Sequence, residues 1–333
     1  MDLMPTADQD AIRDSVRSFL DAELPMSRVR ALCGAAGDAY AALWRAAAEL
    51  GVFGDYALTE QMVLFEELGR SLAPGPWLGS VLAAQALSEG KHAAAAAVSA
   101  GETRVALCLD PWGGPLTLRA DRLSGTRHAV LGAGLADAFL AVDDAGVLFV
   151  PRDAGVKVEA AASLDATNPV GTVTFADAAA ARLPADAAGV RRAAIVLACA
   201  EAVGGIARTV EMSVEYGKVR HQFDKPIGSF QAVKHRCSDM AVRAEVARSA
   251  TTYTAVSVRD GAADADFQVA VAKVLCANAY LQNAADNVQN HGGMGFTWEC
   301  DAHLFVKRSR AFDATIGPRR AQVDALVAQF RAA

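Results

Sequence analysis

The sequence contains no CxxC pair, although it has six cysteines. The cysteines are scattered along the chain: Cys33, Cys108, Cys199, Cys237, Cys276 and Cys300. This spacing lacks the pattern of a structural zinc site or of a disulfide framework, and it fits a reduced, cytoplasmic setting. Four histidines also lack ligand-like spacing: His221, His235, His291 and His303. We therefore expect no metal site in this chain.

An excess of positive charge is also missing, because 32 Lys and Arg residues face 38 Asp and Glu residues. The net charge of −6 argues against a nucleic-acid partner, since proteins that bind nucleic acid do so by neutralising phosphates. The N-terminal stretch MDLMPTADQDAIRDS has neither the basic region nor the apolar region of a signal peptide. No uncharged apolar run is long enough to span a membrane. The sequence therefore predicts a cytoplasmic protein without nucleic-acid or membrane partners.

The chain is rich in apolar residues, which make up 53% of its 333 positions and suffice for two or three subdomains. In the first hundred residues, the apolar positions recur at helical spacing. Thr6 and Gln9 form a candidate capping box ahead of one helix, and further helices are predicted at 40–50 and 58–73. The stretch APGPW ends the last of these helices.

Residues 102–183 show a different pattern, of short β-branched or alternating runs separated by Gly, Pro and Asp turns. No long amphipathic helix separates these runs, so we expect an antiparallel sheet or barrel rather than a parallel sheet. The stretch GAGLAD at 132–137 resembles part of a dinucleotide-binding loop. The strand–loop–helix context that such a loop needs is missing, and we do not interpret it as one.

Helical spacing returns after Gly189 and continues to the end of the chain. We predict four long helices with short links, which is typical of an antiparallel bundle: 193–216, 232–258, 265–289 and 300–330. The Ala-rich faces of the first and third of these are expected to make contacts between subunits. The predicted fold is α+β and multidomain. It comprises an N-terminal helical domain at 1–100, a central antiparallel β domain at 101–185 and a C-terminal four-helix bundle at 189–333.

Two stretches of the C-terminal half carry a resemblance to a known family. They are YGKVRHQFDKPIGSFQAVKHRCSDMA and NVQNHGGMGFTWECDAHLFVKRSR. Together with LTEQMVLFEELGRSLAPGPW and the helical, β, helical order, they closely resemble the acyl-CoA dehydrogenase family. The resemblance covers nearly the whole chain. It implies the fold of that family, FAD as cofactor, an acyl-CoA thioester as substrate and electron-transfer flavoprotein as acceptor.

The resemblance also implies which residues bind FAD. The positions that line the FAD of a neighbouring subunit in the family correspond here to Arg220, Phe223, Gln289, Gly292 and Gly293. A guanidinium can grip a pyrophosphate in two places, which suits Arg220 to that role. Near the same turn, Gln222 and Gln231 can donate amide hydrogen bonds, and Phe223 and Phe230 can pack against the rings of the cofactor. Pro226 and Gly228 set the shape of the turn.

Each of these residues has a plainer interpretation when it is taken alone. Arg220 would then be a solvated loop residue, and Phe223 and Phe230 would be core residues. In the same way, Lys307 and Arg308 would belong to a solvated helix face. The order and spacing of the FAD candidates favour the cofactor-binding interpretation.

The sequence departs from the family pattern in its first two domains. Family members carry a stretch like YxxTExxxGSD that holds the flavin ring of their own subunit, whereas the matching segment here, 107–116, reads LCLDPWGGPL. A Trp-containing strand is replaced by TRHAVLGAG, and a segment like PEEYGG is missing between GVFGDYA and LTEQ. The chain therefore keeps the residues that a subunit donates to its neighbour and lacks those that cradle its own flavin.

The catalytic base is a further departure. The reaction removes the α-proton of the thioester, and most family members supply a Glu for this in a motif like YEGT. This chain has FDAT there, so the candidate base is Asp313, whose side chain is about 1.5 Å shorter than that of Glu. A subset of the family places the base on an earlier helix, where this chain has Ala194. The alternative is that Asp313 is a structural carboxylate.

Three functions remain open. The chain resembles the shorter subunits of actinobacterial heteromeric acyl-CoA dehydrogenases, which implies a non-catalytic partner of a homologous subunit in an α2β2 assembly. It could instead be a complete homo-oligomeric FAD dehydrogenase with Asp313 as base, or a flavin oxidase of the nitroalkane oxidase type. The missing flavin cradle favours the first of these.

Overall fold

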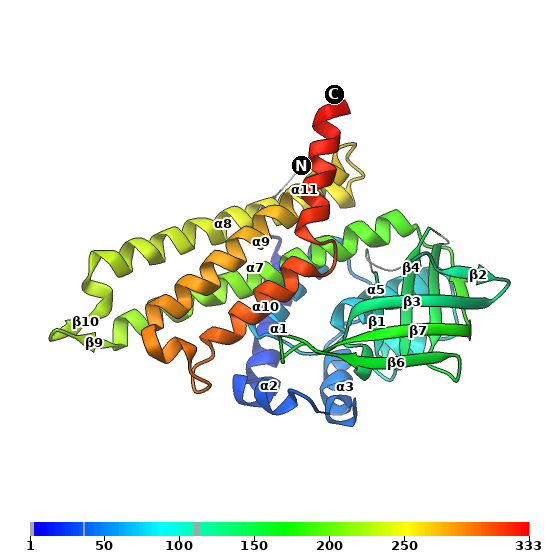
Figure 1. The fold of residues 1–333 in the computed structure, drawn as a ribbon, viewed down its shortest axis with the longest axis horizontal. Coiled ribbons are helices and arrows are strands. Elements are labelled where there is room, and N and C mark those ends of the chain that lie inside the picture. The colour runs from blue at the N-terminus through cyan, green and yellow to red at the C-terminus, as the bar shows by residue number, and fades with distance from the viewer. Residues whose placement is uncertain (1–2, 36, 110–113, 145, 333) are drawn as a thin grey trace. The chain divides into compact units, whose positions relative to one another are not determined.

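The computed structural model describes residues 3–35, 37–109, 114–144 and 146–332. Helices come first, strands follow and helices return, so the chain has the expected multidomain α+β architecture (Figure 1). Two compact units are built from alternating parts of the chain. The first comprises the described residues of Met1–Ala22, Leu58–Leu72 and Val196–Ala333, and the second those of Glu23–Ala57 and Ala73–Ile195. The three domain boundaries predicted from the sequence stay a prediction.

The secondary structure follows the expected order. The helices ahead of the strands are α1 (Ala7–Glu23), α2 (Met26–Leu32), α3 (Ala41–Glu49), α4 (Leu58–Arg70), α5 (Trp77–Glu89) and α6 (Ala95–Ser99). The strands that follow are β1 (Val105–Cys108), β2 (Thr117–Arg119), β3 (Arg122–Leu131), β4 (Ala138–Asp143), β5 (Gly146–Pro151), β6 (Val156–Ala161), β7 (Val170–Ala179) and β8 (Ala181–Leu183). The later helices are α7 (Ala187–Val219), α8 (Gln231–Arg259), α9 (Ala265–His291), α10 (Ala302–Ala314) and α11 (Arg319–Ala332). Three of the four long helices predicted for the C-terminal half are thus confirmed as α7, α8 and α9.

Helix α1 begins at the predicted capping box. The Gln9 amide donates to Thr6 Oγ1 at 3.2 Å, and the Thr6 amide donates to Gln9 Oε1 at the same distance. A helix start leaves backbone amides without partners, and these reciprocal bonds stabilise it. Val16 and Leu20 form the buried face of α1, as the helical spacing predicted.

The β region contains two four-stranded sheets, ordered β1-β4-β5-β8 and β2-β3-β7-β6. The expected antiparallel character is confirmed for all pairs within these sheets except β1 with β4, which run parallel with Val105 opposite Ala138. Strands β2 and β3 of the other sheet lie between β1 and β4 in the sequence. This long connection lets the chain return in the same direction, which a short hairpin could not do.

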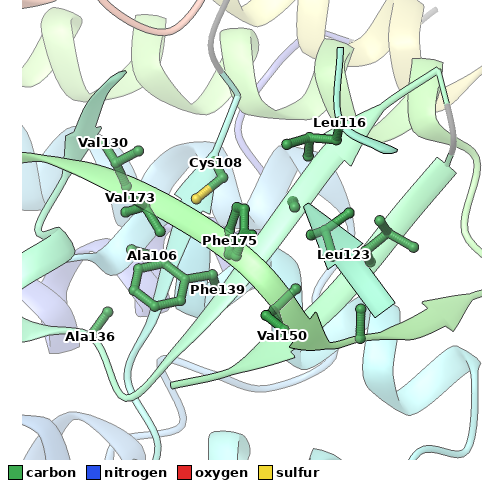
Figure 2. Close-up of a cluster of buried hydrophobic side chains, with 14 of the residues drawn as sticks. Ala106, Cys108, Leu116, Leu123, Val130, Ala136, Phe139, Val150, Val173 and Phe175 are labelled. Atoms are coloured by element: carbon green, nitrogen blue, oxygen red, sulfur yellow. The ribbon is translucent and has the colours of Figure 1, made fainter. Parts of the chain in front are cut away.

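The two sheets enclose a common apolar core (Figure 2). Cys108 and Phe139 come from one sheet, and Val173 and Phe175 come from the other. The rings of Phe139 and Phe175 meet edge to face, with 6.1 Å between their centroids. Alternate residues are buried along the first part of β7, because successive side chains of a strand point to opposite faces. The alternating runs in the sequence therefore mark the sheet faces that pack together.

The first unit is a helical bundle in which α4 and α7 approach each other backbone to backbone. A Cβ at Gly69 of α4 would collide with the carbonyl of Glu201. In the reverse direction, a Cβ at Gly204 of α7 would collide with the carbonyl of Glu66. Only glycine at both positions permits this contact, which fixes how the two helices cross.

The helix predicted at 300–330 is two helices, α10 and α11. Ile316 and Gly317 lie between them with positive φ angles of 43° and 69°, which are incompatible with a continuing α-helix. Pro318 follows and has no backbone N–H with which to continue the helical hydrogen bonds. The prediction of one uninterrupted helix is therefore wrong, and the Gly-Pro pair is the signal that marks the break.

The Ala-rich faces of α7 and α9 are largely buried within the chain. The buried alanines are Ala194, Ala198, Ala200 and Ala202 on α7 and Ala265, Ala270, Ala272, Ala277, Ala279 and Ala284 on α9. The expectation that these faces contact another subunit is therefore wrong, and α8 exposes Val242 and Val246 instead. By length and composition α7 could cross a membrane, but 67% of its most apolar window is buried, as in the core helix of a folded domain.

Candidate functional site

A short hairpin joins α7 to α8 and carries most of the predicted cofactor-binding residues. Strands β9 (His221–Gln222) and β10 (Lys225–Pro226) pair across a turn formed by Phe223 and Asp224. Both turn residues have positive φ angles, of 54° and 62°, as in a type I′ turn. Side chains other than Gly and Asn rarely adopt such angles, so the backbone at Phe223 is strained.

The hairpin is held against the end of α7 by backbone contacts. The Ile227 amide donates to the Arg220 carbonyl at 2.8 Å, and the Arg220 amide donates to the Tyr216 carbonyl at 2.9 Å. A Cβ at Gly228 would lie 2.9 Å from the Gly217 carbonyl oxygen, which is closer than real Cβ contacts come. Gly228 is therefore required for the approach that closes the turn.

The candidate side chains of the hairpin are exposed. Arg220, Gln222 and Gln231 are all exposed, and Phe223 has 84% of its surface exposed, so Phe223 is not a core residue. The Arg220 side chain makes no hydrogen bond or ion pair with any residue that the structure describes. An unpaired guanidinium in this position can hold an anionic group from outside the chain.

Two aromatic rings and a lysine form a small cluster beside the turn. The rings of Phe223 and Phe230 meet edge to face, with 6.0 Å between their centroids. Lys225 Nζ lies 4.4 Å from the centroid of the Phe230 ring, which is within range of a cation–π contact. The two residues predicted as ring walls therefore lie together.

The other candidates lie at the end of α9, which contacts both α7 and α8. His291 stacks on Tyr216 with 4.3 Å between ring centroids. Arg236 of α8 donates to Asn290 Oδ1 at 2.9 Å. The end of α7, the start of α8 and the end of α9 thus meet at one end of the bundle, beside the hairpin (Figure 1). Gln289 is exposed at this end of α9.

The glycine pair after α9 leaves its backbone open. It begins a short 3-10 helix, η4 (Gly292–Phe296). Gly292 has a φ of 61° and a ψ of −143°, a conformation that other residues rarely adopt. A Cβ at either Gly292 or Gly293 would meet no described atom within 4 Å. This backbone is accessible to a ligand, and with the hairpin it offers a cation, amides, aromatic rings and open glycines, which fits a flavin dinucleotide.

Exposed apolar side chains continue this surface beyond the glycines. Phe296 is 83% exposed and Trp298 is 63% exposed. Trp298 contacts His303 edge to face at 4.8 Å between centroids, and Lys307 Nζ lies 4.2 Å from the centroid of a Trp298 ring. Trp298 is not among the residues predicted from the sequence. A Trp next to a Gly-rich turn, in a chain that is only 7% aromatic, is the signal that marks it.

Arg308 does not belong to a solvated helix face. It is buried and forms an ion pair with Glu201 of α7, so that prediction is wrong. Arg308 lies on the same face of α10 as the buried residues Leu304, Phe305 and Phe312. The helical spacing of these three places position 308 on the inner face, where an Arg needs a carboxylate partner.

The candidate base Asp313 lies in the last turn of α10 and is engaged by Arg319 of α11. Arg319 Nε lies 2.8 Å from Asp313 Oδ1, and Arg319 Nη2 donates to Oδ2 at 3.4 Å. The shorter contact is an ion pair without hydrogen-bond alignment, since Oδ1 accepts no hydrogen bond from the described residues. Arg319 also donates to Asn278 Oδ1 at 2.6 Å. These contacts tie Asp313 to α9 and α11, and none of them joins it to the hairpin.

The segment 107–116, which the sequence predicts to stand in place of the flavin cradle, is described only in part. Its residues 110–113 lie outside the described residues. After them, Arg127 donates to the Gly114 carbonyl at 2.7 Å and forms a buried ion pair with Asp143. Asp143 also accepts a hydrogen bond from the Leu116 amide at 3.0 Å. A buried ion pair therefore anchors the end of this segment.

Two of the histidines contact backbone carbonyl groups through a ring nitrogen. His291 Nδ1 lies 2.8 Å from the Asn287 carbonyl oxygen, and His221 Nδ1 lies 3.1 Å from that of Val219. Within the part of the chain that the structure describes, no group of three or more His, Cys, Asp or Glu residues could hold a metal ion.

Replacing Asp224 by Gly is expected to stabilise the hairpin, because Gly adopts the positive φ of this position without strain. The left-handed conformation costs roughly 1–2 kcal/mol for an ordinary residue and less for Asp. We expect Asp224→Gly to raise the free energy of unfolding by about 0.5 kcal/mol and Asp224→Ala to lower it by a similar amount. Urea unfolding of both variants measures the difference. A Gly variant less stable than the Ala variant would show that the Asp224 side chain, and not its φ, sets the stability of the turn.

Comparisons with known proteins identify relatives of this chain. Residues 187–330 match the family described as acyl-CoA dehydrogenase, C-terminal domain. The acyl-CoA dehydrogenase IpdE2 of Mycobacterium tuberculosis is 30% identical over 330 residues, which cover 92% of this chain and 92% of IpdE2. The acyl-CoA dehydrogenase FadE34 of the same organism is 32% identical over 296 residues, which cover 84% of this chain and 41% of FadE34. The chain thus spans less than half the length of FadE34.

A solved structure extends the similarity to the whole fold. A chain of the ChsE4–ChsE5 complex from Mycobacterium tuberculosis matches with a TM-score of 0.89 and 28% sequence identity. The match covers 100% of both chains.

Proposed function

This chain belongs to the acyl-CoA dehydrogenase family of FAD-dependent oxidoreductases, and from that premise we propose that it completes the FAD site of a homologous partner subunit. The two subunits form an α2β2 assembly that dehydrogenates an acyl-CoA thioester at its α and β carbons. This chain donates the grip on the pyrophosphate, and the partner supplies the ring cradle and the catalytic base. The proposed electron acceptor is electron-transfer flavoprotein, and the proposed location is the cytoplasm.

The observation that supports this proposal most directly is the exposed half-site at the hairpin. Arg220 has no partner among the described residues, and Phe223 is 84% exposed on a strained backbone. A large exposed ring on a strained backbone is unfavourable for a chain that stays alone. A second molecule with an aromatic surface would cover the ring, and an anion that it brings would pair with the free guanidinium. The similarity to a chain of the ChsE4–ChsE5 complex supports a partner of the same family.

The residues of this half-site have distinct proposed tasks. When bound, FAD supplies the hydride acceptor of the reaction. Arg220 would hold the pyrophosphate, because an Arg can donate two parallel hydrogen bonds where a Lys cannot. Phe223 and Phe230 exclude water from one side of the dinucleotide. The exposed backbone at Gly292 and Gly293 lets the cofactor approach closely.

The contacts of Asp313 support a base that comes from the partner. A general base must have an oxygen within hydrogen-bonding reach of the proton that it removes. Both Asp313 oxygens face Arg319, and its side chain is about 1.5 Å shorter than the Glu of the family motif. A misplacement on the order of 1 Å can cost about a hundredfold in rate. We therefore assign Asp313 a structural task at the junction of α10 and α11.

The Asp313→Asn variant tests this assignment in the complex with the partner. We expect acyl-CoA to bleach the bound flavin at a rate within about twofold of wild type, because the variant loses only a partly exposed ion pair. The FAD content should also stay unchanged. Stopped-flow absorbance at the flavin band measures the bleaching rate, and Arg319→Gln is the matched control that breaks the same ion pair from its other side.

The alternative function is a complete dehydrogenase with Asp313 as its base. In that case Asp313→Asn abolishes bleaching while FAD remains bound, and Arg319→Gln does not. This result would overturn the assignment of Asp313 as structural.

A further inference from the structure

A buried lysine of α9, Lys273, contacts the segment that contains Asp313. Its side chain is fully buried. Lys273 Nζ donates to the carbonyl oxygen of Phe312 at 2.7 Å and to that of Thr315 at 3.0 Å. It also lies 3.4 Å from the centroid of the Phe312 ring. No step of the proposed function uses this residue, although a buried Lys is rare without a specific partner.

The two carbonyl groups stand at the end of α10, on either side of Asp313. The last carbonyls of a helix have no amide partner within it, so they accept hydrogen bonds from outside the helix. The backbone reverses directly afterwards, with positive φ angles at Ile316 and Gly317. We call residues 312–317 the Asp313 turn. Lys273 is thus a tie between α9 and this turn.

A second tie holds the far side of the same turn. Arg319 binds the Asp313 carboxylate and also donates to Asn278 Oδ1 at 2.6 Å. Lys273 and Asn278 both belong to α9. Helix α9 therefore holds the backbone of the turn directly, through Lys273. It holds the Asp313 side chain indirectly, through Asn278 and Arg319.

The neighbours of Lys273 leave its charge without a dedicated counter-ion. Lys273 forms no ion pair with any residue that the structure describes. The ionisable groups that face it are Cys199 and Glu201 on α7, Cys276 on α9 and Asp313 on α10. Both carboxylates are already paired, Glu201 with Arg308 and Asp313 with Arg319. Among the described residues, the hydrogen bonds of the buried ammonium group go to carbonyl oxygens and an aromatic ring lies against it.

We propose that Lys273 is a positioning residue for the Asp313 turn and that its protonation state controls how readily the turn opens. The turn opens more readily while the buried amine is charged than after it has become neutral. Opening lets water reach the ammonium, which removes the cost of burying an unpaired charge. A neutral amine keeps N–H donors for the two carbonyls and bears no such cost. The proposal concerns this chain alone and does not depend on the role proposed for it in FAD binding.

The direction of the pH effect follows from the protonation of Lys273. Burial lowers the pKa of Lys273 to about 8 from its ordinary value of 10.5. The open turn therefore binds a proton more tightly than the closed turn does. Between about pH 8 and pH 10.5, opening takes up a proton, so the closed state gains stability as the pH rises through this window.

Hydrogen exchange of the full-length chain between pH 7 and pH 9 tests the proposal. The rates of peptides covering the Asp313 turn are corrected for the intrinsic pH dependence of exchange, and peptides of α5 serve as reference. We expect the opening constant of the turn to fall about tenfold between pH 7 and pH 9 while that of α5 stays level. A constant that is level or rises over this range would overturn the proposal. This wild-type series decides the matter even if a Lys273 variant does not fold.

Two variants of Lys273 identify the titrating group. Lys273→Gln is neutral and Lys273→Arg is charged at every pH of the series, so both are expected to remove the pH dependence. A hydrogen bond from Cys199 lowers the pKa of Cys276, which would act in the same direction, so Cys276→Ser is the necessary control. We expect Cys276→Ser to keep the tenfold change. If it removes the change, or if Lys273→Gln retains it, the tie is not controlled by Lys273.

Discussion

Arg220→Ala is expected to release FAD from the assembled complex on dilution. Among the predicted FAD-binding residues of the hairpin, only Arg220 carries a positive charge, and its guanidinium can bind a pyrophosphate at two points. Its side chain forms no hydrogen bond or ion pair within the described part of the chain. Removing a charged hydrogen-bond donor typically costs roughly 1.5–3 kcal/mol. We therefore expect FAD to bind about 10- to 150-fold more weakly, which equilibrium dialysis or flavin fluorescence measures.

Matched variants separate the grip on the pyrophosphate from general charge effects. Arg220→Lys keeps the charge but not the planar fork, and it should fall between wild type and Arg220→Ala. Arg259→Ala removes an exposed Arg at the other end of α8, and we expect it to leave FAD binding unchanged. If Arg220→Ala holds FAD as tightly as wild type in its oligomer, Arg220 does not contact the cofactor.

The helices of the C-terminal half could be predicted well because their spacing signals are long and repeated. Helices α7, α8 and α9 are each more than 25 residues long, so many apolar positions agree on one period. The capping box at Thr6 was predictable for a different reason, because two local side chains alone decide it. The break at Gly317 and Pro318 was missed, although it is also local, because the apolar spacing continues across it.

The candidate site could be listed from the sequence but its geometry could not. A Phe disfavours a positive φ, so nothing local predicts that Phe223 forms the second position of a type I′ turn. That turn is set by the close approach of Gly217 and Gly228, which are eleven positions apart. Lys273 was missed for a similar reason, since a Lys is ordinarily assigned to a helix surface. The apolar stretch around it, VAVAKVLCANA, is the signal that this Lys is buried.

The second large effect concerns assembly. On the proposed function, a chain with the pyrophosphate grip and without the Thr-Glu and Gly-Ser-Asp cradle has half of an FAD site. Two copies would then both offer the grip and could not complete each other. We expect this chain, made alone, to be colourless. The exposed apolar residues at the hairpin, at η4 and on α8 should nonetheless cause it to associate with itself: Phe223, Val242, Val246, Met294 and Phe296.

The complex with its partner is expected to differ completely from the chain alone. Co-expression with a homologous acyl-CoA dehydrogenase subunit is expected to bring the missing cradle and base. We expect a yellow α2β2 complex with about one FAD per pair of unlike chains, because each pair completes one site from two complementary halves. Arg220→Ala in this chain should make the colour fade on dilution, and loss of the cradle in the partner should abolish it.

The amount of flavin per chain tests the central claim most directly. The chain is purified alone and together with its partner, and FAD is released from each sample and quantified against protein concentration. The half-site proposal predicts essentially no FAD for the chain alone and about one FAD per pair of unlike chains for the complex. One FAD per subunit in the chain alone, with turnover of an acyl-CoA, would contradict the proposal and identify the chain as a complete dehydrogenase.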